Sequence, residues 1–140
     1  MLLSAIILAG GNSNRMNQDK GLSLLSGMPL VEHVIAKVID LVDEVILIVK
    51  NESQKQLYLS KLDYTFIIKT DKSKFSSPMI GAITGLSITK SDYTIILACD
   101  MPFISKQAIN ILFEEAKSHN GSVFQHSNGW IEPLCAVYKV

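Results

Sequence analysis

A glycine-rich loop near the N-terminus carries the residues best suited to chemistry. Gly10 and Gly11 directly follow an apolar run, and the basic residues Arg15 and Lys20 come a few positions later. Adjacent glycines let successive backbone N–H groups turn toward one point, where they form an anion-binding concavity. The two basic side chains would add full positive charges to that concavity. This pattern is typical of a site for a di- or triphosphate.

Two well-known phosphate-binding patterns do not occur in this loop. A Walker A motif ends in Gly-Lys followed by Ser or Thr, and the dinucleotide fingerprint contains three spaced glycines. The loop has neither arrangement, which argues against ordinary kinases, GTPases and dehydrogenases. On spacing alone, a tight turn flanked by solvated charges explains the loop equally well.

Asp100 is the candidate ligand for a metal ion. It follows the apolar run at residues 94–98, which has the character of a strand, and Pro102 ends regular structure soon after it. A carboxylate at a strand end beside a phosphate loop suits Mg²⁺, because that ion takes one or two carboxylates together with phosphate oxygens and water. Taken alone, an Asp-x-Pro segment more often forms a turn.

Short apolar runs alternate with helical patterns along the chain. The apolar runs lie at residues 5–9, 45–49, 66–68 and 94–98. The helical patterns begin near Pro29, Ser53, Pro78 and Ser105. Strands that are apolar on both faces belong in a parallel sheet covered by helices, so we predict a three-layer α/β/α fold with a mostly parallel sheet. Ligands bind at the carboxyl ends of such strands, where the glycine-rich loop begins.

The helical patterns also predict where helices end and how they pack. The apolar stripe of the first pattern extends to Leu41, and the last pattern begins with an N-cap at Ser105 and stops at Asn120. In the third pattern Gly81 and Gly85 lie four positions apart on one face. Without side chains there, we expect the backbone of this helix to approach a strand closely.

The composition is that of one folded domain. The chain has 140 residues, of which 48% are hydrophobic, and 13 Lys plus Arg balance 13 Asp plus Glu. Nucleic acid is not an expected partner, because phosphate-backbone binding normally needs a basic excess. The apolar N-terminus lacks a preceding basic residue and a membrane-spanning length, which predicts a buried strand in a cytoplasmic protein with no membrane partner. Cys99 and Cys135 are predicted to be buried thiols and Trp130 a core residue.

The glycine-rich loop and two later segments form one recognisable pattern. The segments are Leu8-Ala9-Gly10-Gly11-x-Ser13-x-Arg15-Met16-x-x-Asp19-Lys20, Gly27-x-Pro29-Leu30-x-x-His33-Val34 and Cys99-Asp100-Met101-Pro102-Phe103. Together they resemble the molybdenum cofactor guanylyltransferases, which are nucleotidyltransferases of the glycosyltransferase-A-like fold. The resemblance implies a Rossmann-like fold of the nucleotide-diphospho-sugar transferase type. It covers nearly the whole chain, since residues 67–71, 77–81 and 132–138 also look like family segments.

The resemblance implies a reaction and a role for each site residue. Family members transfer GMP from GTP to the terminal phosphate of molybdopterin and release pyrophosphate, with Mg²⁺ as the metal. Lys20 and Arg15 would then neutralise phosphate charge and Asp100 would bind Mg²⁺, which makes these three the candidate catalytic residues. The backbone of Leu8, Ala9 and Gly10 would face the base and ribose, and Gly11 is a further candidate for binding the nucleotide. Protein partners in cofactor delivery are a further expectation.

Asp71 is the candidate for choosing the base. It comes shortly after the apolar run at residues 66–68 and matches an acidic position of the family. Guanine presents two adjacent donors, N1–H and N2–H₂, that one carboxylate accepts together, whereas cytosine and adenine offer no such pair. Because lysines stand close by in sequence, Asp71 could instead be a solvated loop residue.

The chain departs from the family pattern at three places. Asn17 stands where the family usually has Gly, and residues 77–81 replace Gly-Pro-Leu-Ala-Gly. The family also continues for several dozen residues beyond the position of Val140. We therefore expect residues 1–140 to form a single nucleotide-binding domain that lacks the family's C-terminal segment, binds GTP, and transfers guanylyl groups poorly or not at all.

Two alternatives to the guanylyltransferase remain open. The first is a cytidylyltransferase for the same cofactor, or a nucleotidyltransferase acting on a sugar phosphate. Such relatives tend to have Ala-Ala-Gly in place of residues 9–11 and Pro in place of Asp19, so the loop favours the guanylyl branch. The second is a non-catalytic module that binds GTP or docks on a partner.

Overall fold

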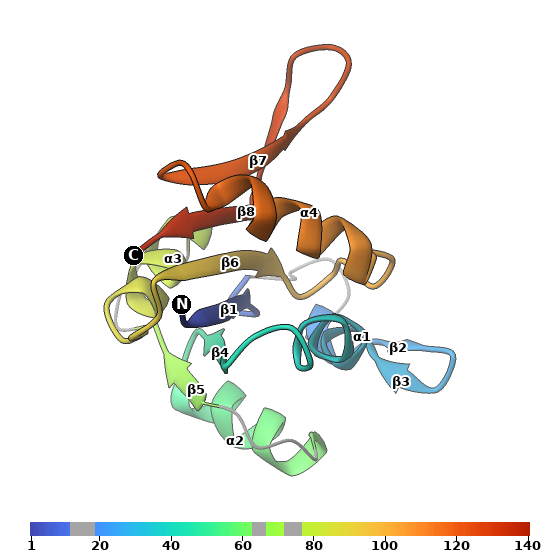
Figure 1. Ribbon diagram of the computed structural model, residues 1–140. Helices are drawn as coiled ribbons and strands as arrows, with labels where there is room; N and C mark the ends of the chain where they lie inside the picture. The colour runs from blue at the N-terminus through green and yellow to red at the C-terminus, as the bar shows by residue number, and fades with distance from the viewer. Residues whose placement is uncertain (12–18, 63–66, 72–76) are drawn as a thin grey trace.

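A six-stranded sheet organises the computed structural model, which describes residues 1–11, 19–62, 67–71 and 77–140 (Figure 1). The strands are β1 (Leu3–Leu8), β4 (Glu44–Val49), β5 (Ile67–Thr70), β6 (Tyr93–Ala98), β7 (Gly121–Gln125) and β8 (Ile131–Lys139). Their order across the sheet is β5-β4-β1-β6-β8-β7. The pairs β5–β4, β4–β1 and β1–β6 are parallel, whereas β8 is antiparallel to both β6 and β7. The prediction of a mostly parallel sheet is confirmed.

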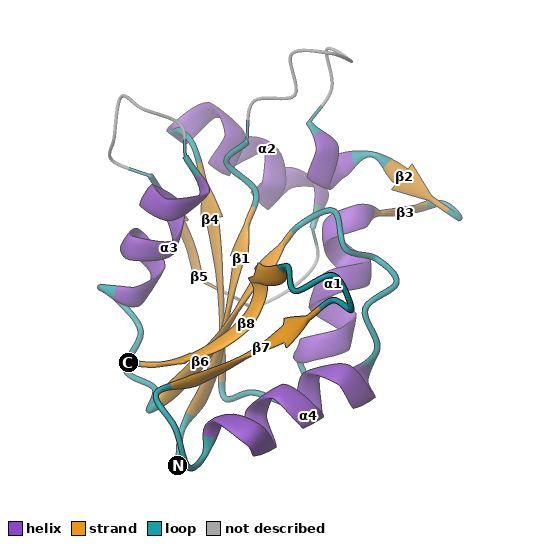
Figure 2. Ribbon diagram, turned by 90° about the horizontal axis from the view of Figure 1, so that it is seen from above, coloured by secondary structure: helices purple, strands orange, loops and turns teal. Residues whose placement is uncertain are grey.

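Helices cover both faces of this sheet (Figure 2). They are α1 (Leu30–Val38), α2 (Glu52–Lys61), α3 (Pro78–Leu86) and α4 (Lys106–Ala116), and a short 3₁₀ turn, η1 (Lys20–Leu22), precedes the hairpin of β2 (Leu24–Leu25) and β3 (Met28–Pro29). Residues from α1, α2 and α4 pack in one core cluster with the sheet, and residues from α3 pack in the other. The fold is the predicted three-layer α/β/α arrangement.

The alternation of side chains along the strands explains why the apolar runs show no polar positions. Ile7 of β1 and Leu47 of β4 belong to the core beneath α1, α2 and α4. Ile6 and Ile46, one position earlier, belong to the core beneath α3. Since successive side chains of a strand point to opposite faces, a strand covered on both faces must be apolar at every position.

Backbone hydrogen bonds continue past the carboxyl ends of the parallel strands. The N–H of Ala9 donates to Ile48 O at 2.8 Å, that of Asp71 to Val49 O at 2.7 Å, and that of Cys99 to Leu8 O at 3.1 Å. The segments that follow β1, β5 and β6 therefore leave the sheet at the same edge. This edge is where the sequence predicts a ligand.

Helix α3 approaches β1 as its two glycines predict. A Cβ built on Gly85 would lie 2.7 Å from the nearest atom of Ile6, and one built on Gly81 would lie 3.1 Å from Leu8 Cδ2. A side chain at Gly85 would collide with the strand. Because Gly81 and Gly85 have no side chain, α3 can lie close to β1 near the carboxyl edge of the sheet.

Several local predictions are wrong. The first helix ends at Val38 and excludes Leu41, and the last helix ends at Ala116, short of Asn120. Trp130 is not a core residue, because 75% of it is exposed at the turn between β7 and β8.

The prediction for the two cysteines is confirmed, since Cys99 and Cys135 are both buried and unpaired thiols. Among the described residues, none of the helices has both the length and the apolar character needed to cross a membrane.

Candidate functional site

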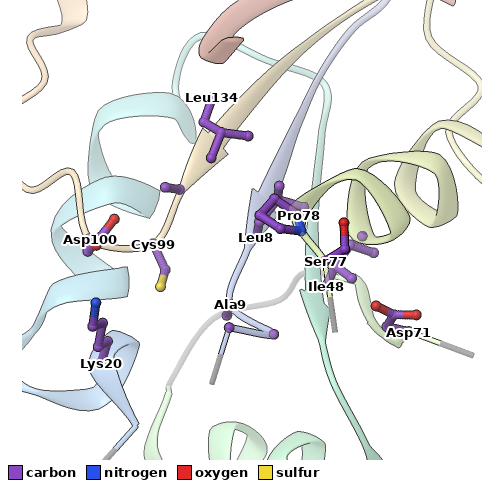
Figure 3. A pocket seen from close by; sticks show the side chains of 14 residues that line it. Leu8, Ala9, Lys20, Ile48, Asp71, Ser77, Pro78, Cys99, Asp100 and Leu134 are labelled. Carbon is purple, nitrogen blue, oxygen red and sulfur yellow. The ribbon is translucent and has the colours of Figure 1, made fainter. Parts of the chain in front are cut away.

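A cavity of about 210 Å³ opens at the carboxyl edge of the sheet (Figure 3). The candidate residues that the structure describes all line it, namely Leu8, Ala9, Gly10, Gly11, Lys20, Asp71 and Asp100. They come from segments that are far apart in sequence and that the parallel strands bring together. Arg15 lies outside the described residues.

Lys20 and Asp100 lie at the same end of the cavity. Lys20 is exposed at the start of η1, and Asp100 is exposed just after β6. Within the described parts of the chain, the Asp100 carboxylate makes no hydrogen bond or ion pair, so its oxygens face solvent at the cavity. One cation and one exposed carboxylate at a strand end form a suitable environment for a metal-bound polyphosphate.

The donor set at this end fits a metal ion held partly by its substrate. Among residues 1–11, 19–62, 67–71 and 77–140, no cluster of three or more His, Cys, Asp or Glu side chains could hold a metal ion. Mg²⁺ keeps several water ligands and is bound through one or two carboxylates plus phosphate oxygens rather than by a protein cage. A lone carboxylate at Asp100 is consistent with that mode of binding.

Asp71 marks the opposite end of the cavity, together with residues of α3. Its backbone is fixed by the hydrogen bond to Val49 O, and its side chain is partly buried. Ser77 lies beside it as the N-cap of α3, where its hydroxyl accepts a hydrogen bond from Met79 N at 3.2 Å. Apolar side chains line the neighbouring wall, namely Leu8, Ile48 and Pro78. A partly buried carboxylate beside an apolar wall suits a flat ring that carries hydrogen-bond donors on one edge.

The two glycines of the loop leave room between these ends. A Cβ on Gly10 would lie 3.4 Å from Lys50 N, and a Cβ on Gly11 would meet no atom within 4 Å. Neither glycine has a positive φ, so backbone conformation does not require glycine at either position. Their contribution is the open approach of a ligand to the backbone.

The Cys99 thiol lies in the same cavity and is held in its protonated form. Burial, followed by the negative charge of Asp100, raises the pKa of Cys99 to about 12. The thiolate is the reactive form of cysteine, and it is scarcely populated near neutral pH at such a value. This agrees with a site whose chemistry uses no covalent intermediate.

Two buried residues that contact Asp19 were not identified from the sequence. Gln54 and Tyr58, both on α2, form hydrogen bonds to Asp19, the residue before Lys20. Hydrophobic patterning does not detect them, because both of these buried side chains end in a polar group. One available signal is Asn51 followed by Gln three positions later, which is an N-capping arrangement, and Asn51 Oδ1 does accept from Gln54 N at 2.8 Å.

Comparison with known proteins finds a matching family and similar relatives. Residues 5–140 match the family described as the MobA-like NTP transferase domain. A probable molybdenum cofactor guanylyltransferase of Natronomonas pharaonis is 34% identical, with 97% of this chain and 67% of the relative aligned. This chain spans between 63% and 70% of the length of three such relatives.

Solved structures share the fold. Molybdopterin-guanine dinucleotide biosynthesis protein A of Archaeoglobus fulgidus superimposes with a TM-score of 0.78 at 23% identity, covering 97% of this chain and 67% of that one. A Mycobacterium tuberculosis protein in complex with manganese gives a TM-score of 0.75 at 10% identity, covering 99% and 71%. The chain therefore shares its three-layer fold with these structures.

Proposed function

We propose that this chain, which belongs to the family of MobA-like NTP transferases, binds GTP with Mg²⁺ and transfers GMP to molybdopterin. The reaction would join the α-phosphate of GTP to the terminal phosphate of molybdopterin and release pyrophosphate. One observation carries the proposal: Lys20, Asp71 and Asp100 line one cavity at the carboxyl edge of the sheet. The curated relatives that bear the guanylyltransferase name support the choice of nucleotide and acceptor.

The end of the cavity at Lys20 and Asp100 would take the triphosphate. Lys20 would neutralise charge on the β- and γ-phosphates, because its ammonium is a compact charge on a long stem. Asp100 would hold Mg²⁺, which supplies charge stabilisation on the α-phosphate and the departing pyrophosphate. Arg15 is proposed as a second cation for the phosphates.

The acceptor needs no activation by a base. A phosphate is already largely ionised at neutral pH, so positioning and charge stabilisation are what the protein must supply. The protonated Cys99 thiol is consistent with direct transfer between phosphates. The residues named here accordingly act by binding and by electrostatics.

The end at Asp71 would take the guanine. The Asp71 carboxylate would accept hydrogen bonds from N1–H and N2–H₂, and the apolar wall of Leu8 and Ile48 would cover a face of the ring. Cytosine lacks this donor pair. The proposal therefore includes a preference for GTP over CTP.

Calorimetric titration with GTP, CTP and ATP, each with and without Mg²⁺, tests the binding part. We expect GTP to bind most tightly and only with Mg²⁺ at full affinity. Equal or tighter binding of CTP would favour a cytidylyltransferase instead. Pyrophosphate release with molybdopterin as the acceptor tests the transfer, and GTP binding without any release would favour a non-catalytic binding module.

A further inference from the structure

A buried polar network joins Ala9 to Asp19 and involves residues outside the cavity lining. Helix α2 buries Gln54 and Tyr58, with exposed fractions of 6% and 0%. Both side chains end in hydrogen-bonding groups. Burying such groups is unfavourable unless each forms a hydrogen bond. The partners of these hydrogen bonds therefore show which residues α2 holds in place.

The amide of Gln54 uses all of its polar atoms. Its Nε2 donates to Ala9 O at 2.8 Å and also to the carboxylate of Asp19. Its Oε1 accepts from the backbone N–H of Lys50 at 2.7 Å. One amide group therefore joins the residue that precedes the glycine-rich loop to the residue at its far end.

Asp19 is held from a second side by Tyr58. The Tyr58 hydroxyl donates to Asp19 Oδ1 at 2.5 Å, and the same oxygen accepts from Gly21 N at 3.0 Å. Burial, and then the hydrogen bond to Asp19, raises the pKa of Tyr58 well above its usual range, so the phenol stays a donor. A Cβ on Gly21 would lie 2.1 Å from the Tyr58 oxygen, which shows how closely the turn packs on this ring.

The geometry points to Gln54 as a positioning residue for nucleotide binding and guanylyl transfer, acting with Tyr58 on Asp19 and through it on Lys20. Asp19 is the N-cap of η1, and Lys20 is the first residue of that turn. Fixing Asp19 therefore fixes where the Lys20 stem begins, and the bond to Ala9 O, whose residue is itself held to the sheet by Ile48 O, anchors the Gln54 amide. Preorganising Lys20 in this way removes an ordering cost that phosphate binding would otherwise bear. This inference rests on the proposed function, since it assigns Lys20 to the phosphates.

Gln54→Glu is the direct test. The substitution keeps the shape but replaces the donor with a carboxylate that faces Asp19 and the Ala9 carbonyl. We expect affinity for GTP with Mg²⁺ to fall about ten-fold or more, as for loss of a charge-assisted hydrogen bond. Affinity for GMP, which lacks the β- and γ-phosphates, should fall much less. Gln56→Glu is the matched control, because Gln56 is exposed on the same helix and bonds only to Glu52 there.

Two further measurements separate positioning from a general structural role. In a Lys20→Ala background, Gln54→Glu should weaken GTP binding little further, because its effect passes through Lys20. Lowering the pH should restore part of the affinity of Gln54→Glu relative to Gln54→Met, since a protonated carboxyl can donate again. Tyr58→Phe removes one hydroxyl and keeps the ring, so we expect a smaller loss of GTP affinity with the same selectivity for GTP over GMP. This variant replaces Gln54→Glu in the test if Gln54→Glu does not fold.

The outcomes are distinct. If the unmodified protein does not bind GTP, the proposed function fails and this inference fails with it. If it binds GTP but Gln54→Glu matches Gln56→Glu, the inference is overturned and the proposed function stands. Equal losses for GTP and GMP, or additive effects of the Gln54 and Lys20 substitutions, would also overturn it.

Discussion

Asp71→Asn should convert a guanine-selective site into one that discriminates poorly. Asn keeps the shape of the side chain, but its amide presents one acceptor and two donors where the carboxylate presents two acceptors. Guanine N1–H and N2–H₂ are both donors. One of the two hydrogen bonds to the base would therefore be replaced by a contact between two donors.

The structure sets the size of the expected effect. Hydrogen bonds to charged groups contribute about 1.5–3 kcal/mol each when they are buried. Asp71 is only partly buried at the end of the cavity, so the lower part of this range applies. A loss of about 1.5 kcal/mol corresponds to roughly ten-fold weaker binding of GTP. CTP, which offers no such donor pair, should lose little or gain slightly.

Calorimetry with GTP and CTP on the same protein preparation measures this ratio. Asp40→Asn is a suitable control, because Asp40 is exposed and its ion-pair partner is Lys106, at the surface. The control should leave both affinities unchanged. If Asp71→Asn weakened GTP and CTP equally, Asp71 would have no part in choosing the base.

Three other perturbations have defined outcomes. Asp100→Asn should abolish the Mg²⁺ dependence of GTP binding while keeping the fold, and superimposed Mg²⁺ titrations of variant and wild type would place the metal elsewhere. The pKa of Cys99 in the folded state is raised to about 12, so the thiol loses its proton at lower pH in the unfolded state than in the folded state. The contribution of this group to stability is therefore present below the unfolded-state pKa and is lost as the pH rises toward 12. On going from mildly to strongly alkaline pH, the Tm of Cys99→Ala should accordingly fall less than that of the wild type. Gly85→Ala should destabilise the fold by about 1–3 kcal/mol through its clash with Ile6, seen as a lower Tm, whereas Gly11→Ala should leave Tm nearly unchanged because its Cβ has open space.

The fold was predictable because its central strands are buried on both faces. Apolar runs such as residues 45–49 carry a signal that local sequence alone reveals, and the strand ends then fix where Asp71 and Asp100 emerge. The edge of the sheet was harder to predict. Strand β7 alternates between partly buried and exposed residues, so its sequence resembles a loop as much as a strand.

Turn chemistry accounts for another part of what the sequence did not reveal. The hairpin of β2 and β3 depends on Ser26 and Gly27, whose φ angles are 52° and 79°. A Ser-Gly turn between strands of two residues each is too short to give a periodic signal. Trp130 was misassigned for a related reason, since an aromatic residue before a strand is core only if the turn points inward, which local sequence does not determine.

The two ends of the site are supported by different residues. This explains why only one of the two supports could be predicted from the sequence. The end at Asp71 rests on α3, whose approach to β1 is set by Gly81 and Gly85, and small residues at helical spacing are a readable pattern. The end at Lys20 rests on Gln54, whose side-chain amide donates to the Ala9 carbonyl and the Asp19 carboxylate, both distant in sequence. A buried amide is chosen by the geometry of its partners rather than by hydrophobicity, so it becomes visible only once the chain is folded. Because the supports share no residue, substitutions at Asp71 and Gln54 should weaken GTP binding independently, with free energies that add.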